Sequence, residues 1–302
     1  MMPFRVVLVI GNGFDLDLRL KTKYSDFVSS EEWRSLLDKQ PSSTYSLIKY
    51  LDSKSKIENW FDIEQALLDY VTVESRGGWP HNVEIDKVDH KLVCEALSTY
   101  IGNHLNSRSH NINGTDAVKL LRAFNDIDRD RKKIYTFNYT SLDLLSRVAA
   151  ISHLAPVEHI HGSTHDKSII LGFEFEGGMS AFHEYSFLFK SHSPYYHYTD
   201  IENDMVEAEE VIIFGHSLNP IDATYFRRYL LQLCNNNDAS KRLTIITYDE
   251  QSRLAILANL RQMGISIPQL FSQGHLEFIL TKEEDQNDIN KDRFEGLLNR
   301  IR

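Results

Sequence analysis

Two glycines and a carboxylate stand directly after the first apolar run of the sequence. Residues 6–10 are apolar, and the segment 11–15 reads GNGFD. Glycines between a strand and a helix let the main chain approach a phosphate, and the amides and dipole at the helix start attract the anion. A tight turn that serves no ligand is the alternative explanation of the glycines. For a nucleotide ligand, we predict contacts from Gly11, Asn12, Gly13 and Asp15.

An asparagine follows a second apolar run in the same way. The segment 132–137 reads KKIYTF, and Asn138 comes directly after it. In an open parallel sheet, ligands bind outside the carboxyl ends of the strands, and an amide offers both a donor and an acceptor to a ribose hydroxyl or a water. We predict that Asn138 is catalytic and that Thr136 contacts the ligand. The alternative is a capping role at the start of a helix over 141–151.

Histidines close a third apolar run. His159 and His161 lie two residues apart in EHIHG (158–162), so a strand would direct them to the same side. Because an imidazole titrates close to neutrality, His161 is a candidate general base. With His165 the segment has three histidines, but a second cluster of carboxylate or cysteine ligands is missing, and we expect no metal.

A serine follows the apolar run at 210–215. The segment 214–222 reads FGHSLNPID, and we predict that Gly215, Ser217 and Asp222 contact the ribose or phosphate of a ligand. The alternative is a serine hydrolase, since G-x-S-x-G after a strand forms a nucleophile elbow. Asn219 replaces the closing glycine of that motif. The catalytic triad of this alternative would be Ser217, Asp249 and His275.

Apolar, β-branched segments of strand length alternate with stretches of helix length. Continuous apolar runs are typical of strands that are buried on both faces of a parallel sheet. We therefore predict an α/β fold with a doubly wound, mostly parallel, Rossmann-like sheet. The strand segments are 5–11, 132–137, 158–162, 168–173, 210–215, 242–248 and 275–280, and helical patterns follow at 141–151, 223–234 and 251–264.

The stretch 25–131 contains no convincing strand. Its helical patterns lie around 29–39, 44–53, 60–72 and 86–105, and a crossover between strands normally needs far fewer residues. We predict a helical insertion or lid over 25–131. The remaining segments, 1–24 and 132–302, would form the nucleotide-binding domain.

Composition limits the class of protein. The chain of 302 residues has 33 Lys and Arg against 43 Asp and Glu, a formal net charge of −10, and only 2 cysteines. The acidic balance argues against extensive, sequence-independent binding of nucleic acid. Two cysteines provide neither a disulfide framework nor a four-cysteine zinc site. Because the apolar run at 6–10 is too short for a signal peptide or a membrane span, we expect a cytoplasmic protein without membrane contact.

Taken together, the motifs resemble the AbiH family, which is named for abortive infection of phage-infected cells. The resemblance rests on GNGFDLDLRLKTKYSDF, NWFDIEQAL, TFNYT, HIHGS and FGHSLNPIDATYF, in that order. It implies phage defence, with a phage-derived trigger and a homo-oligomer as candidate partners. Trp60, Asp62 and Glu64 fit the family pattern, but we derive no chemistry for them.

A more distant resemblance is to sirtuin-like domains, whose ligand is NAD. It implies that Gly11 and Gly13 hold the phosphates and that Asn138 faces the nicotinamide ribose. It further implies that His161 is catalytic, and that Gly215 and Ser217 contact the adenosine side. Thr140 stands where sirtuins carry an aspartate, and the zinc cysteines of the deacetylases are missing. The resemblance therefore implies hydrolysis of NAD to nicotinamide and ADP-ribose, with a non-catalytic NAD or ADP-ribose sensor as the alternative.

Overall fold

The structure is a computed structural model of the chain. It describes the residues 6–40, 46–57, 62–72, 82–106, 112, 114–142, 151, 157–174, 183–235, 240–272, 275–282 and 288–302. The predicted helix over 141–151 lies almost entirely outside the described residues, as does Trp60.

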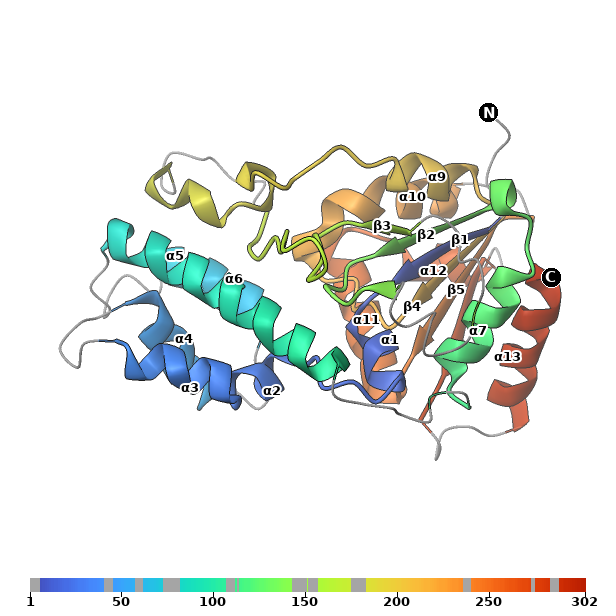
Figure 1. Cartoon of the computed structure of the whole chain (residues 1–302). Coiled ribbons are helices and arrows are strands. Elements are labelled where there is room, and N and C mark those ends of the chain that lie inside the picture. The colour runs from blue at the N-terminus through green and yellow to red at the C-terminus, as the bar shows by residue number, and fades with distance from the viewer. Residues whose placement is uncertain are drawn as a thin grey trace. The chain divides into compact units, whose positions relative to one another are not determined.

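Six parallel strands form one sheet in the order β3-β2-β1-β4-β5-β6 (Figure 1). This is the strand order of a Rossmann fold, and it confirms the predicted doubly wound, parallel α/β class. The chain reverses its winding between β1 and β4, so the connections that leave these two strands continue to opposite faces of the sheet. The strands are β1 (Val6–Ile10), β2 (Lys132–Thr136), β3 (Val157–His159), β4 (Glu210–Phe214), β5 (Arg242–Thr247) and β6 (Leu276–Leu280).

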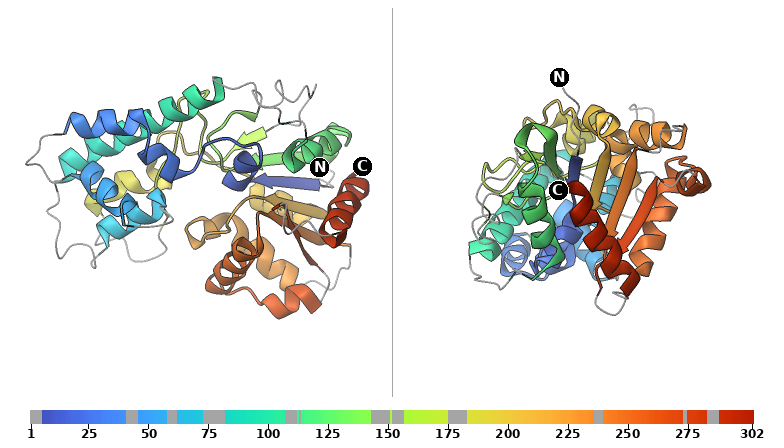
Figure 2. Two further views of the ribbon diagram at one scale, coloured as in Figure 1. Left: turned by 90° about the horizontal axis from the view of Figure 1, so that it is seen from below. Right: turned by 90° about the vertical axis from the view of Figure 1, so that its right-hand side faces the viewer.

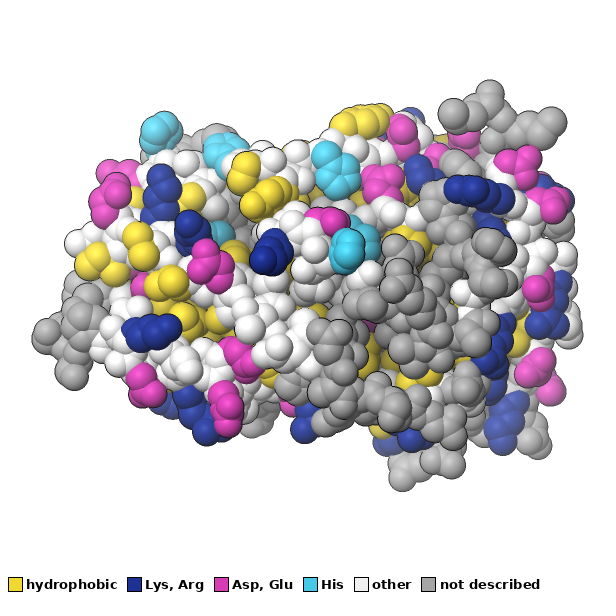
Figure 3. Space-filling view, in the orientation of Figure 1, with side chains coloured by type: hydrophobic (Ala, Val, Ile, Leu, Met, Phe, Trp, Pro, Cys, Tyr) yellow, Lys and Arg dark blue, Asp and Glu magenta, His cyan; other side chains and the backbone are white. Residues whose placement is uncertain are grey.

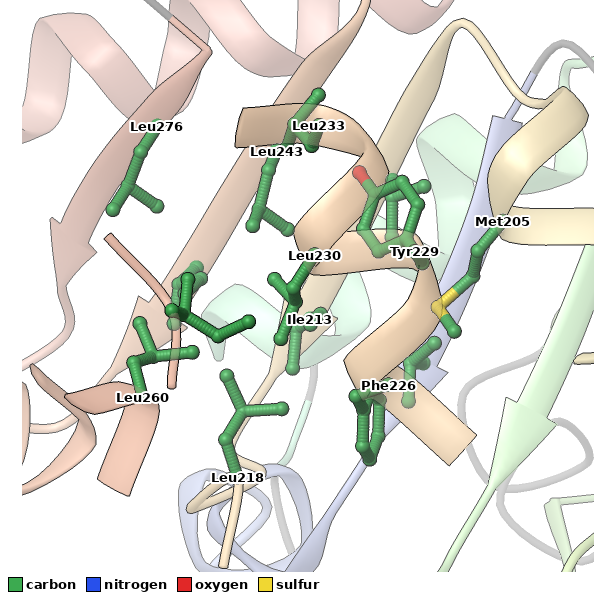
Figure 4. Packing of buried hydrophobic residues seen from close by; sticks show 14 of the residues in the cluster. Met205, Ile213, Leu218, Phe226, Tyr229, Leu230, Leu233, Leu243, Leu260 and Leu276 are labelled. Carbon is green, nitrogen blue, oxygen red and sulfur yellow. The ribbon is translucent and has the colours of Figure 1, made fainter. Parts of the chain in front are cut away.

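Helices cover both faces of the sheet (Figures 1 and 2). Val7 and Val9 of β1 belong to a large apolar core that continues into the helices on their side, as Figure 4 shows for ten labelled residues. On the other face, Lys132 of β2 donates to the carbonyls of Phe124 and Asn125. The helices of the core face are α9 (Ile201–Glu207), α10 (Ala223–Asn235), α11 (Glu250–Gln262) and α12 (Ile267–Ser272), and those of the opposite face include α7 (Asp116–Asn125) and α13 (Asp288–Ile301).

The prediction of a strand over 168–173 is wrong. This segment has no regular strand and makes one isolated bridge, between Phe173 and Phe189. Its apolar side chains are buried, but Gly172 packs against the carbonyl of Leu188, and the carbonyl of Leu171 contacts His90 Nε2 at 2.8 Å. An apolar run indicates that its side chains are buried. In this segment, irregular packing buries them without a neighbouring strand.

The chain divides into two compact units. Unit 1 comprises 1–20, 109–160 and 198–302, and unit 2 comprises 21–108 and 161–197. Unit 1 contains the sheet and also α7, which the predicted insertion 25–131 includes. Unit 2 contains the other described α-helices of that insertion together with the segment 161–197, which follows β3.

Unit 2 is helical. Its helices are α2 (Tyr24–Val28), α3 (Glu31–Asp38), α4 (Leu47–Ser55), α5 (Ile63–Val71), α6 (Val83–Asn106) and the short turns η3 (His183–Leu188) and η4 (Lys190–His192). Two buried carboxylates of α6 hold the start of α4, because Asp86 accepts from the Leu47 amide and Asp89 accepts from the Ile48 amide. Among the described helices of the whole chain, none has both the length and the apolar character to cross a membrane. Acidic and basic side chains are interspersed over the face seen in Figure 3.

Candidate functional site

The loops after β1 and β4 are in direct main-chain contact in unit 1. The Gly11 amide donates to the Phe214 carbonyl at 2.9 Å, and the Gly13 amide donates to the Gly215 carbonyl at 2.8 Å. A Cβ atom on Gly13 would lie 2.6 Å from Gly215 Cα, and one on Gly11 would lie 2.5 Å from the Cα of His216. The close approach of the two loops therefore explains both glycines. The predicted phosphate contacts stay a prediction.

Gly215 is restricted in a second way. Its φ of 69° lies in the left-handed region, and a Cβ there would be 2.3 Å from the Phe14 amide nitrogen. Only glycine adopts this conformation without strain and also leaves space for the turn after β1. The sequence GNGFD and the sequence FGHS are thus two halves of one packed junction.

Asp15 lies beside this junction, in α1 (Asn12–Asp17). The residue is 1% exposed, and its Oδ2 accepts from the hydroxyl of Thr140 at 2.6 Å. Burial raises the pKa of Asp15 to about 7, although the side chains of Thr140 and Asn138 lower it. No described residue forms a hydrogen bond with the buried Oδ1. Asp15 is therefore a carboxyl that changes its ionisation near neutral pH.

Asn138 connects the end of β2 to the same junction. Its amide nitrogen donates to Thr136 Oγ1 at 3.1 Å, and its side-chain Nδ2 donates to the Gly11 carbonyl at 3.0 Å. The carbonyl of Asn138 contacts His159 Nδ1 at 3.2 Å. The structure thus brings the predicted residues Gly11, Gly13, Asp15, Thr136, Asn138 and Gly215 together at the carboxyl ends of β1, β2 and β4.

Thr140 joins the segment after β2 to α1. Its hydroxyl is hydrogen-bonded to the Asp15 carboxylate, so α1 places a carboxylate beside position 140.

The loop after β4 contains a buried histidine that the sequence analysis did not select. His216 Nδ1 accepts from the Leu218 amide at 3.0 Å, and its Nε2 lies 3.6 Å from Oδ2 of Asp222. The His216 ring also packs on Phe137, with ring centroids 4.4 Å apart. The carboxylate of Asp222 therefore lies next to the His216 ring. Ser217 is exposed, and its carbonyl accepts from Asn259.

The Ser217–Asp249–His275 triad of the serine hydrolase alternative is wrong. Ser217 follows β4, whereas His275 precedes β6 and its Nδ1 contacts the carbonyl of Lys241, just before β5. Because all strands are parallel, Ser217 lies at the carboxyl ends of the strands and His275 lies at their amino ends. Asp249 instead caps α11 through the amide and hydroxyl of Ser252, and these hydrogen bonds lower its pKa.

His161, the other predicted catalytic residue, belongs to unit 2. Its Nε2 lies 3.2 Å from Nζ of Lys190, and the same Nζ lies 3.1 Å from Oε2 of Glu64. The Lys190 side chain is completely buried, and that of Glu64 is 13% exposed. Asp62, two residues before Glu64, caps α5 by accepting from the Glu64 and Gln65 amides. We call Glu64, Lys190 and His161 the lysine cluster.

A family model described as "Bacteriophage abortive infection AbiH" matches residues 7–246. The chain belongs to the AbiH family. This membership supports a role in phage abortive infection, as the motifs predicted. The match includes the junction of unit 1 and the lysine cluster, and it ends within β5. A comparison with curated protein sequences finds no match.

Two groups in this AbiH protein escaped the sequence analysis. Lys190 follows the apolar stretch FLF (187–189), and a lysine next to such a stretch was the available signal for a buried charge. His216 lies inside a motif that we interpreted through its glycine and serine. Among the residues that the structure describes, no group of three or more His, Cys, Asp or Glu side chains is placed to hold a metal ion.

Proposed function

We propose that this AbiH protein hydrolyses NAD to nicotinamide and ADP-ribose at the junction in unit 1. The observation that carries the proposal is Asp15. A carboxyl group that is buried at the switch point of a Rossmann-like sheet and has a pKa of about 7 is unusual for a structural residue. Clefts at the carboxyl ends of strands near such a switch point are where open α/β sheets bind nucleotides.

The chemistry of nicotinamide release suits this group. When the glycosidic bond breaks, its electron pair leaves with the nicotinamide nitrogen, and positive charge develops on the ribose. An ionised Asp15 in a water-poor environment would stabilise that charge. A water then adds to the ribose carbon, and Asp15 takes the proton that this water loses. The amide of Asn138 would orient the water or a ribose hydroxyl.

For the proposed reaction, we predict further contacts with NAD from four residues that border the junction or the loops that form it: Asn12, Thr136, Ser217 and Asp222. The amides of Gly11 and Gly13 already donate to main-chain carbonyls, so these amides do not serve as evidence for phosphate binding. The sensor alternative rested on the absence of a carboxylate at position 140, and the contact between Thr140 and Asp15 weakens that reasoning.

The test is release of nicotinamide from NAD, followed by chromatography, for the purified protein and for extracts of phage-infected cells that express it. We expect Asp15→Asn and Asn138→Ala to lower the rate by about 10²–10³-fold. Asp17→Asn is the matched control, because Asp17 lies in the same helix and its carboxylate accepts from the Ala117 amide. We expect this control to keep the activity.

Two results would overturn the proposal. One is an Asp15→Asn protein that releases nicotinamide as fast as the wild type. The other is NAD that remains intact with the wild-type protein under both conditions. NAD that binds, stabilises the fold and is recovered unchanged would favour the sensor.

A further inference from the structure

The lysine cluster of unit 2 contains a lysine that has no access to solvent. The side chain of Lys190 is 0% exposed, and its Nζ lies between Oε2 of Glu64 and Nε2 of His161. These three residues come from α5, from the segment after β3 and from η4.

The pairing with Glu64 determines the form of the lysine. An ammonium group is buried at acceptable cost only beside an opposite charge, and the Glu64 carboxylate at 3.1 Å provides it. A charged lysine has three N–H donors and no acceptor. In the contact of 3.2 Å with His161, the lysine therefore donates and Nε2 accepts.

This direction of donation fixes the imidazole. A ring nitrogen that accepts a hydrogen bond carries no proton, so a neutral His161 has its proton on Nδ1. We infer that Lys190 is a positioning residue that holds His161 in the neutral Nδ1–H form, in which His161 donates a hydrogen bond and does not act as a general base. On this inference, His161 does not fill the general-base role that the sequence suggested.

The inference deepens the proposed function and rests on it only where catalysis is concerned. A His161 that accepts at Nε2 from Lys190 does not take the proton that the attacking water loses, and we have proposed Asp15 for that step.

The decisive measurement is the tautomer of His161 in the full-length protein, by ¹⁵N NMR with labelled histidine near neutral pH. The His161→Gln protein identifies the signals by their loss. We expect a protonated Nδ1 and an unprotonated Nε2 in the wild type. Wild-type protein with the proton on Nε2, or with both nitrogens protonated, would overturn the inference without any variant.

Substitutions at position 190 sharpen the measurement. We expect Lys190→Met to move the proton toward Nε2, and Lys190→Arg to retain the wild-type pattern because arginine keeps a charged donor. The control is Lys54→Met in the same unit, where the lysine Nζ lies 3.9 Å from Asp69 and the side chain is partly exposed. This control should leave the His161 signals unchanged. An unchanged tautomer in a folded Lys190→Met protein would contradict the inference.

The activity measurement separates the two proposals. Because the inference excludes His161 as the general base, we expect His161→Gln to keep nicotinamide release within about tenfold of the wild-type rate. A loss of about 10²–10³-fold in the folded variant would contradict the inference. Absence of NAD hydrolysis in the wild type would defeat the proposed function, while the tautomer measurement would still decide the role of Lys190.

Discussion

Asp15 in unit 1 and Lys190 in unit 2 are both buried ionisable residues, but the protein treats their charges differently. Lys190 has a carboxylate at 3.1 Å, so its charge is compensated where it lies. The side chains that lower the pKa of Asp15 are the uncharged Thr140 and Asn138, but burial raises the pKa to about 7. A compensated charge can hold a neighbour in place, whereas an uncompensated carboxyl exchanges its proton near neutral pH. The first arrangement suits positioning and the second suits chemistry.

The largest expected effect comes from opening the junction that buries Asp15. Gly215→Ala would place a methyl group 2.3 Å from the Phe14 nitrogen on a residue with φ of 69°. We expect a loss of about 4 kcal/mol in the free energy of unfolding, from the clash and the backbone strain together. Urea denaturation would measure it. A loss below about 1 kcal/mol would show that the two loops separate easily and that the burial of Asp15 is not fixed by them.

The second prediction removes the charge of Lys190 and so leaves the compensated pair of unit 2 incomplete. Lys190→Met leaves the Glu64 carboxylate in a largely buried site without its cation, and we expect a loss of about 3 kcal/mol. Neutralising both partners, in Lys190→Met with Glu64→Gln, should restore most of this loss. Denaturation of the single and double variants gives the coupling energy. A double variant as unstable as the sum of its singles would mean that the two charges are not coupled.

The Asp15→Asn protein should become more stable relative to the wild type as the pH rises. The pKa of Asp15 is raised from 3.8 to about 7, so between these values the folded state holds a proton that the unfolded state has released. The wild type therefore loses stability until the pH passes 7, and the asparagine variant does not. Between about pH 5.5 and about pH 8, we expect the variant to gain about 2 kcal/mol over the wild type. A constant difference over this range would show that Asp15 is already ionised in the folded protein at low pH.

The smallest expected effect is a Gly→Ala substitution in unit 2, which is the counterpart of Gly215→Ala. Gly102 lies inside α6, and a Cβ there meets no atom within 4 Å. Alanine lowers the entropy of the unfolded chain and favours the helix, so Gly102→Ala should stabilise the protein by about 0.5–1 kcal/mol. Thermal unfolding would detect this as a small rise in Tm. A fall in Tm would reveal a constraint on α6 that its local geometry does not show.

The sequence predicted the sheet well because its strands are buried on both faces and appear as continuous apolar runs. β1, β4 and β5 lie within the predicted segments for this reason. The same signal failed at 168–173, where irregular packing buries the apolar side chains. The serine hydrolase alternative relied on the order of Ser217, Asp249 and His275 in the chain. That order does not show at which end of the strands His275 lies.

The candidate site was predictable in part. The glycines and Asn138 were selected because they directly follow apolar strands, and Asp15 because it lies near the glycines. The burial of Asp15, its partner Thr140 and its raised pKa depend on residues 125 positions apart, which no local pattern reveals. The contact of His161 with Lys190 joins two segments that we predicted as parts of the sheet domain. No pattern in the sequence linked these two residues.

The position of β1 in the middle of the sheet has a consequence for synthesis of the protein. Val6 pairs with Lys132 on one side and with Glu210 on the other. The first strand to leave the ribosome therefore stays unpaired until both neighbouring strands have been synthesised. On a nascent chain that ends before β4, the turn containing Asp15 remains in water, and its carboxyl behaves like that of an ordinary aspartate. An activity that depends on the buried form of Asp15 would therefore begin only after β4 has been synthesised.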